Sequence, residues 1–434
     1  MTGRYKAYPE YKDSGLRWLP ELPSNWKVER TKRMFALKRS LVGNQSSDYQ
    51  LLSLTLKGVV PRDISSGEGK IPESFDTYQK VDENDLIFCL FDMDETPRTI
   101  GISPLNGMIT GAYNVYGCLE GCCANYAYYY FLHIDSFKGL KPFYTGLRKV
   151  VRAETFGNIE MPCASFEEQQ KIVNFLDHET AKIDTLITKQ EKLIELLREK
   201  RQAVISHAVT KGLNPDAPMK NSGVEWLGEV PNHWVIKSYR YACKIYRGKF
   251  GHRPRNDPAF YDGEFPFIQT GDVARAGKYI KDYKQTLNEK GIGVSQKFPV
   301  GTLMMTIAAN IGDTAILGFE AYAPDSVVGF KPKADIDLEF LRYSFMAALP
   351  ALEQTSTQST QANLNVDRIG AVQASFPSVS EQKEIVAYLD SLLEQYDDIE
   401  SKSQKSIELM NERKTALISA AVTGEIDVRD WESK

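Results

Sequence analysis

Apolar residues recur at helical spacing over a long stretch without a single Pro or Gly, from Glu168 to Thr210. Steps of four and three alternate along this stretch, which is the pattern of a coiled-coil seam. The seam consists of Ile183, Ile187, Gln190, Ile194, Leu197, Arg201, Val204 and Ala208. The pattern predicts one helix over 180–210, about 45 Å long at about 1.5 Å per residue. Gly212 follows it as a plausible stop.

A second apolar pattern of the same kind lies near the end of the chain and stops at Gly424. It comprises Tyr396, Ile399, Ile407, Met410, Leu417 and Ile418. One amphipathic helix cannot bury its own stripe, but two can cover each other. We therefore expect an antiparallel pair formed within one chain. The alternative is that each helix packs on its own neighbouring domain.

The segments between these helices read differently. Roughly 30–160 and 240–375 contain short apolar runs separated by Gly, Pro and Asp, for example 85–91, 265–273 and 301–307. Such runs are typical of strands joined by turns. Each segment is long enough to fold as a mixed α and β domain.

The chain is a tandem repeat. SGLRWLPELPSNWKV at 14–28 returns as SGVEWLGEVPNHWVI at 222–236, and EEQQKIVNFLD at 167–177 returns as SEQKEIVAYLD at 380–390. IELLREKRQAVISHAVT at 194–210 also matches IELMNERKTALISAAVT at 407–423. Two colinear matches around dissimilar middles indicate a duplicated unit. We predict an α+β fold with four parts: a domain over 1–160, a spacer helix over 161–215, a second domain over 216–375, and a second spacer helix with the tail over 376–434.

Composition narrows the class of protein. The chain has 434 residues, 42% hydrophobic and 25% charged, with a formal net charge of −4. This balance is that of a globular protein of several domains and excludes a bulk polycation. No apolar run is long enough to cross a bilayer, and the N-terminus lacks the apolar core of a signal peptide. Six cysteines without paired metal-ligand spacing are expected to be reduced thiols, so we expect a cytoplasmic protein.

The sequence contains no convincing catalytic motif. It lacks the phosphate-binding GxxxxGK[ST], the zinc-binding HExxH and the dinucleotide fingerprint. It also lacks the Asn-Pro-Pro-aromatic motif of an amino-methyltransferase, because its only Asn-Pro is Asn214-Pro215. Pro324-Asp325 with Lys331 and Lys333 resembles a nuclease motif only in fragments. The acidic run from Asp82 to Glu95 suits a solvated loop edge better than a divalent cation site. We expect no catalytic residues and no bound metal.

Binding signals concentrate in the second middle segment. No acidic residue stands between Glu229 and Asp257, whereas seven basic residues do. Such side chains neutralise phosphates, and Arg also reads guanine; a solvated surface face is the alternative. The candidate DNA contacts are Arg247, Lys249, Arg253, Arg255, Lys278, Lys281 and the polar Gln358, Thr360 and Gln361.

The first middle segment is acidic, with thirteen acidic and five basic residues over 48–135. Its candidate DNA contacts are Arg148, Lys149 and Arg152. DNA binding here requires a basic edge with the acids turned away.

The paired motifs resemble those of the DNA-specificity subunits of type I restriction–modification systems. The resemblance rests on the Ser-Gly-x-x-Trp openings, Ser14 to Trp26 and Ser222 to Trp234, and on Glu168-Gln169 and Glu381-Gln382. It implies that each middle segment reads one half of a bipartite, asymmetric site on double-stranded DNA. It also implies that the helices set the spacing, so that four residues inserted near Asn214 or in the helices should alter the half-site spacing or abolish binding.

The same resemblance implies partners and a division of labour. Two methyltransferase subunits would dock on the helices and use S-adenosylmethionine, and restriction subunits would use ATP and Mg. The chain itself would hold no cofactor and catalyse nothing. Two other interpretations stay open at this point: a coiled-coil scaffold or adaptor without sequence preference, and a nuclease with an unrecognised site.

Overall fold

The computed structural model describes residues 5–63, 74–308, 311–354 and 364–432. The chain divides into two compact units, one formed by Met1–Gln190 with Gln404–Lys434 and the other by Glu191–Ser403. Each unit contains a globular part and one half of each long helix, α4 (Phe166–Lys211) and α10 (Val379–Val422). The domain boundaries expected from the sequence stay a prediction, because the compact units cut across both helices.

Within each unit, α4 and α10 run antiparallel. In the first unit Lys414 Nζ lies 2.7 Å from Asp184 Oδ2. In the second, Arg198 Nη2 lies 2.7 Å from Glu400 Oε1, and Arg201 pairs with Asp397. Rising numbers on α4 therefore meet falling numbers on α10. The expected antiparallel pair within a single chain is confirmed.

The heptad seam faces the interior as predicted. Its eight α4 positions are buried or half-buried, whereas the apolar residues Leu186, Leu193 and Leu196 lie outside it and are 38 to 51% exposed. On α10, the prediction that Ile399 belongs to the buried stripe is wrong, because its side chain is 39% exposed. The seam also joins the main cores. Ile183 packs with Leu417 and Ile418 in the first unit, and Ile205 packs with Ile385 in the second.

The globular part of the first unit is built on short antiparallel strands. Its main sheet has the order β4-β11-β8-β9 and is joined by four two-stranded ribbons. The sheet strands are β4 (Phe35–Lys38), β11 (Asn114–Cys118), β8 (Leu86–Phe88) and β9 (Ile100–Ile102). The ribbons are β1 (Tyr11–Leu16) with β2 (Leu19–Pro23), β3 (Lys27–Arg30) with β12 (Glu160–Cys163), β5 (Leu52–Thr55) with β6 (Gly58–Pro61), and β7 (Gln79–Val81) with β10 (Gly107–Ile109).

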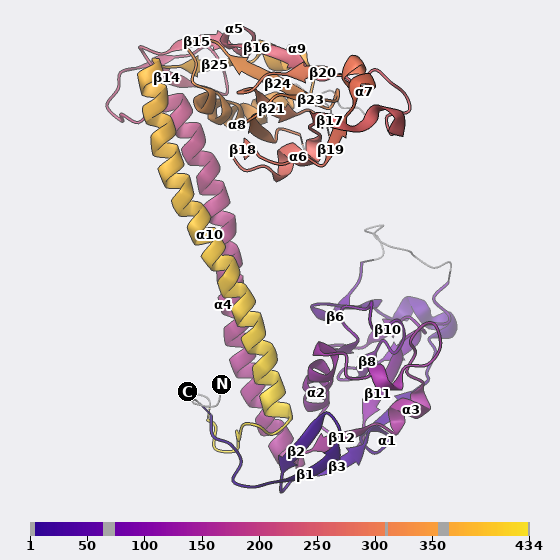
Figure 1. Cartoon of the computed structure of the whole chain (residues 1–434). Helices are drawn as coiled ribbons and strands as arrows, with labels where there is room; N and C mark the ends of the chain where they lie inside the picture. The colour runs from indigo at the N-terminus through magenta and orange to yellow at the C-terminus, as the bar shows by residue number, and fades with distance from the viewer. Residues whose placement is uncertain (1–4, 64–73, 309–310, 355–363, 433–434) are drawn as a thin grey trace. The chain divides into compact units, whose positions relative to one another are not determined.

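The helices of this part are α1 (Thr31–Met34), α2 (Ala124–Ser136), α3 (Ala153–Gly157), and the 3₁₀ turns η1 (Gly43–Asp48) and η2 (Lys141–Phe143). Helix α2 lies between the sheet and the long helices (Figure 1). Tyr126, Tyr130 and Phe131 of α2 are buried in the same core as Phe88 and Trp26.

The second unit carries two larger sheets. One has the order β16-β24-β21-β22-β18 and the other β19-β17-β23-β20. Their strands are β16 (Cys243–Arg247), β24 (Val327–Pro332), β21 (Leu303–Thr306), β22 (Thr314–Leu317), β18 (Tyr279–Ile280), β19 (Gln285–Leu287), β17 (Tyr261–Phe267), β23 (Ala321–Ala323) and β20 (Gln296–Phe298). The ribbons are β13 (Met219–Asn221) with β14 (Glu229–Pro231), and β15 (Val235–Ser238) with β25 (Gln373–Phe376).

The shorter helices of the second unit are α5 (Tyr239–Ala242), α6 (Thr270–Arg275), α7 (Glu289–Val294), α8 (Leu338–Gln354), α9 (Val366–Ala371) and the 3₁₀ turn η3 (Pro258–Phe260). Helix α8 occupies the place that α2 has in the first unit, between a sheet and the long helices (Figure 1). The expected mixed α+β architecture is confirmed.

The closing motif of each repeat, 167–177 in the first and 380–390 in the second, attaches the globular part to its long helix. Gln169 Oε1 accepts the backbone N–H of Cys123, at the start of α2, at 2.8 Å. Gln382 Oε1 accepts the N–H of Asp337, at the start of α8, at 2.7 Å. Both glutamines are fully buried, and burial makes an unsatisfied amide costly.

A tyrosine–aspartate bond repeats in the same way. The hydroxyl of Tyr129 on α2 donates to Asp177 on α4 at 2.6 Å, and that of Tyr343 on α8 donates to Asp390 on α10 at 2.6 Å. Asp177 and Asp390 close the repeated motifs 167–177 and 380–390. The recurrence of these residues thus has a structural cause.

Two further expectations concern sulfur and membranes. All six cysteines are free thiols, as predicted. Across the described residues, no helix combines the length and apolarity that a membrane span requires.

Candidate nucleic-acid interface

The basic stretch of the second unit runs through β15, α5 and β16 into the loop before η3. Its first members are structural. Lys237 pairs with Asp335 at 2.5 Å, and Arg240 Nε donates to the backbone carbonyl of Gly370 at 3.2 Å. These contacts hold the β15–β25 ribbon and α9 in place, so both side chains are already engaged.

Arg253 and Arg255 approach a common carboxylate. Arg255 Nη2 lies 2.6 Å and Arg253 Nη2 lies 3.7 Å from Asp325 Oδ2. Arg253 also donates to the carbonyls of Phe250 and His252 at 2.7 and 2.8 Å, which fixes its orientation. Two guanidinium groups facing one carboxylate leave a net positive charge at an exposed edge.

The two remaining candidates of this stretch flank the same region. Lys249 is exposed, and its side chain makes no ion pair among the described residues. Arg247, at the end of β16, pairs with Asp367 on α9. This pair is well exposed, so solvent and salt screen it and a phosphate competes with it readily.

A hollow of about 340 Å³ opens beside Arg255. Its lining contains the amide side chains Asn256, Gln269 and Gln285, together with the ring of Tyr261. Gln269 Nε2 donates to Gln285 Oε1, so the two amides meet at the hollow although they come from different elements. Amides of this kind can bond adenine through two atoms in the major groove.

Lys278 and Lys281 differ in their surroundings. Lys278 Nζ lies 2.5 Å from Glu339 on α8 and 2.7 Å from Asp390 on α10. Partial burial lowers the pKa of Lys278, but the hydrogen bonds to Asp390 and Glu339 outweigh it and raise that pKa. Lys278 therefore bridges three elements, whereas Lys281 is exposed.

In the first unit, the candidate cations interlock with the acidic run. Arg148 Nη2 lies 2.7 Å from Asp92 Oδ2, and Lys149 Nζ lies 3.1 Å from Asp94 Oδ2. These carboxylates neutralise the two cations, so the condition that the acids turn away, which the sequence sets for DNA binding, is not met at Arg148 and Lys149. Arg152, just before α3, is exposed and makes no ion pair in the described part of the chain.

Asp82 and Asp85 of the acidic run are also paired. Lys38 Nζ lies 2.7 Å from both Asp82 and Asp85. Among the described residues, no three His, Cys, Asp or Glu side chains are grouped so as to hold a metal ion. Gln358, Thr360 and Gln361 lie outside the described residues.

Comparison with known proteins gives a family match for part of the chain. Residues 243–409 match the family model described as type I restriction modification DNA specificity domain. The match covers the strand β16 and the loop that carries Arg253 and Arg255.

Residues 243–409 of this chain are thus similar to a type I DNA specificity domain. The resemblance predicted from the paired motifs is therefore confirmed.

Curated relatives carry the same description. The chain is 26% identical over 176 residues to the type I restriction enzyme MjaIX specificity subunit of Methanocaldococcus jannaschii, covering 39% of this chain and 40% of that protein. It is 22% identical over 305 residues to the EcoBI specificity subunit of Escherichia coli, covering 66% of this chain and 62% of that protein. The matched region thus spans less than two thirds of each relative.

Solved structures share the fold of the specificity domain and its helices. A chain from a structure of type I restriction–modification assembly superposes with a TM-score of 0.70 at 15% identity, covering 93% of this chain and 99% of that one. The HsdS subunit from Thermoanaerobacter tengcongensis superposes with a TM-score of 0.52 at 15% identity, covering 93% and 98%. At these identities the likeness concerns the fold.

The specificity domain contains candidate readers that the sequence did not single out. Gln269 follows β17 and Gln285 begins β19, sixteen residues apart, and Asn256 lies in the loop after Arg255. Isolated amides carry no pattern in a sequence. Gln269 lay inside the predicted run 265–273, and neither Gln285 nor Asn256 adjoined a predicted run, so no sequence pattern marked them.

Proposed function

We propose that this chain is the sequence-specific DNA-binding subunit of a type I restriction–modification complex. Each unit would read one half of a bipartite, asymmetric site on double-stranded DNA. The observation that carries the proposal is the specificity-domain match over 243–409, which coincides with the cluster of Arg247, Arg253 and Arg255.

The second unit offers both kinds of contact that such reading needs. Arg253 and Arg255 hold excess positive charge at Asp325, where a DNA phosphate can compete for the guanidinium groups. Gln269 and Gln285 line the adjoining hollow and suit base edges. Phosphate contacts position a protein on the duplex, and base contacts specify the sequence.

The first unit would read the other half-site with different chemistry. Arg148 and Lys149 would exchange Asp92 and Asp94 for phosphates, and Arg152 is exposed already. Because the two globular parts differ in sequence and in sheet order, the two half-sites are expected to differ as well.

The long helices would set the half-site spacing and dock two methyltransferase subunits. In the second unit, Leu193 and Leu196 of α4 and Tyr388 and Ile399 of α10 are 38 to 48% exposed and lie outside the seam. Where exposed apolar side chains form a contiguous patch, that patch commonly marks a protein–protein contact. The methyltransferases would use S-adenosylmethionine, restriction subunits would use ATP and Mg, and this chain would position them in the cytoplasm without catalysis of its own.

Methylation mapping tests the proposal. DNA from cells that express this chain with its methyltransferase partner is sequenced for modified bases and compared with DNA from cells lacking this chain. We expect an interrupted, asymmetric N6-methyladenine motif that depends on the chain. With an active, expressed partner and no dependent motif, the proposal fails and a scaffold without sequence preference explains the chain better.

A further inference from the structure

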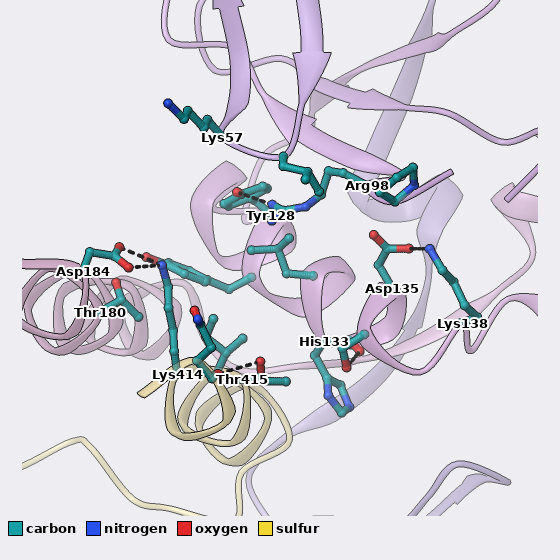
Figure 2. Close-up of a pocket in the computed structure, with 17 residues that line it drawn as sticks. Lys57, Arg98, Tyr128, His133, Asp135, Lys138, Thr180, Asp184, Lys414 and Thr415 are labelled. Atoms are coloured by element: carbon teal, nitrogen blue, oxygen red, sulfur yellow. Dashed lines mark hydrogen bonds and ion pairs between the residues drawn. The ribbon is translucent and has the colours of Figure 1, made fainter. Parts of the chain in front are cut away.

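A second polar hollow lies within the first unit, and neither Arg148 nor Arg152 lines it. It measures about 770 Å³ and opens between the tip of the β5–β6 hairpin, α2 and the two long helices. In Figure 2, Lys57 and Arg98 occupy one wall, and Asp184 with Lys414 the opposite one. The residues that line this hollow lie outside the specificity-domain match over 243–409.

The cations of the hollow fall into two kinds. Lys138 lies 2.7 Å from Asp135, and Lys414 lies 2.7 Å from Asp184, so both are neutralised. Lys57 and Arg98 make no ion pair among the described residues. Two positive charges are therefore left over.

The guanidinium group of Arg98 is oriented by a hydrogen bond and keeps its positive charge for an anion. Its Nη1 donates to the hydroxyl of Tyr128 at 3.3 Å, a neutral acceptor that orients the guanidinium without cancelling its charge. Burial lowers the pKa of the neighbouring His133 to about 4, so that imidazole is uncharged at neutral pH. Thr180, Thr415 and Asn411 add hydroxyl and amide groups to the walls.

The second unit places equivalent groups beside its own helix pair. Arg201 pairs with Asp397 at the positions where the first repeat pairs Lys414 with Asp184. Arg342 directly precedes Tyr343 on α8, as Tyr128 directly precedes Tyr129 on α2. Its guanidinium carbon lies 5.7 Å from the Tyr343 ring centroid.

Arg342, like Arg98, makes no ion pair among the described residues. Its Nε donates to the carbonyl of Thr314 at 3.4 Å. Each unit thus brings an arginine to the junction between its globular part and its long helices. In the first unit the arginine comes from the loop before β9, and in the second it comes from α8. Since the middle segments share no sequence pattern, this agreement points to a common role.

We propose that each junction holds the phosphodiester backbone of DNA, in contacts that are independent of base sequence. This inference rests on the proposed DNA-binding function and adds a second contact region to it. Arg and Lys together with Thr, Asn and Tyr are the side chains that bind DNA phosphates.

The test compares two double variants of the full chain in complex with its methyltransferase partner. Arg98→Gln with Lys57→Gln removes the two unpaired charges of the hollow. Arg17→Gln with Lys27→Gln removes one exposed Arg and one exposed Lys on the β1–β2 turn and β3 of the same unit. Binding is measured against salt on a duplex carrying the mapped motif and on a duplex of unrelated sequence.

For the hollow variant we expect a several-fold loss of affinity for both duplexes. The slope of log K against log salt should fall in magnitude by about 2, since each phosphate that the protein neutralises contributes roughly 0.9 to the slope. The methylated motif should stay the same, because no base contact changes. The matched control should keep the wild-type affinity and slope, and Arg342→Gln should lower the slope by about 1.

Other outcomes overturn the inference. An unchanged affinity and salt slope, with a wild-type complex that methylates its motif, removes the hollow from the DNA interface and leaves the proposed function intact. Loss of methyltransferase co-purification at unchanged DNA affinity assigns the hollow to an acidic partner segment instead. If the wild-type complex shows no dependent motif, the proposed function itself has failed.

Discussion

The indole Nε1 of Trp26 donates a hydrogen bond to Oε1 of Glu168 at 2.9 Å, and both side chains are buried. Trp234 makes the same bond to Glu381 at 3.0 Å. The opening and closing motifs of each repeat, more than 140 residues apart, therefore meet at the first turn of a long helix. There the carboxylate also lies favourably near the helix N-terminus.

Replacing Trp26 by Phe should destabilise the first unit by about 2 kcal/mol, the cost of losing a hydrogen bond to a buried charged group. Denaturant unfolding measures the change. The control is Trp226→Phe, because the Nε1 of Trp226 donates to Gln373 O at 3.0 Å in an exposed place where water can substitute. Equal losses for both variants would show that the Glu168 bond has no special weight.

The antiparallel helix pair predicts a specific cross-link. Arg198 and Glu400 form an ion pair across α4 and α10 of the second unit, so a short bis-methanethiosulfonate reagent should link Arg198→Cys to Glu400→Cys within one chain. Non-reducing electrophoresis with peptide mapping detects it, and each single variant controls for the six native thiols. Products that join two chains only would contradict the pairing.

His133 should make stability depend on pH. Burial lowers its pKa to about 4 from the ordinary 6.5, so the unfolded chain binds the proton first. This contribution to stability is complete above about pH 6.5 and is lost as the pH falls toward 4. The difference in unfolding free energy between wild type and His133→Asn should shrink over that range, and a difference that stays constant would exclude the titration.

The candidate cations of the second unit should separate into two classes. Arg255→Ala should weaken binding to every duplex and lower the salt slope by about 1, and Arg253→Ala should behave likewise. Lys278→Ala should instead destabilise the fold by about 2 kcal/mol, because it leaves Glu339 and Asp390 facing each other. A salt-slope change for Lys278→Ala without loss of stability would reverse this division.

Base reading should depend on the amide pair. Gln269→Ala should relax the preference at one or two positions of the methylated motif, since a good two-atom contact contributes about 1–3 kcal/mol of discrimination. Methylation mapping of the variant reads this directly. Glu289→Ala, at the exposed start of α7, is the control, and an unchanged motif for Gln269→Ala would place base recognition elsewhere.

The spacing function can be tested by lengthening both helices. Seven residues inserted after Gln190 and seven after Ser403 keep the seam in register and add about 10.5 Å, or about three base pairs. The gap in the methylated motif should grow accordingly. An insertion near Asn214, which the sequence favoured equally, should leave the gap unchanged, because Gln382 and Tyr343 fix the second globular part to the helix.

Much of the fold could be read from the sequence because its signals are local or repeated. The seam from Ile183 to Ala208 follows from spacing alone, and the repeat exposed the motifs that turn out to join helix and domain. Which of the cations pair with carboxylates could not be predicted in this way. Lys278 meets Glu339 and Asp390, 61 and 112 residues away, and only the folded chain brings them together.

The ion pairs of the first unit could not be predicted for the same reason. The count of thirteen acidic and five basic residues over 48–135 gives the net charge of that segment but not which charges meet. Whether Asp92 faces Arg148 depends on two loops meeting, which no periodicity encodes. Amides such as Gln269 and Gln285 acquire meaning only when two strands bring them to one hollow.

The fixed joints at Gln169 and Gln382 have an evolutionary consequence. Each joins backbone atoms at the start of α2 or α8 to the long helix, and so makes no demand on the side chains of the strands and loops beyond. Mutation or exchange of a middle segment can then alter the DNA sequence that is recognised, while the hydrogen bonds of Gln169 and Gln382 to the backbone are kept. A lineage carrying such a chain can then change the DNA sequence that is recognised without changing the long helices or the proteins that would bind to them.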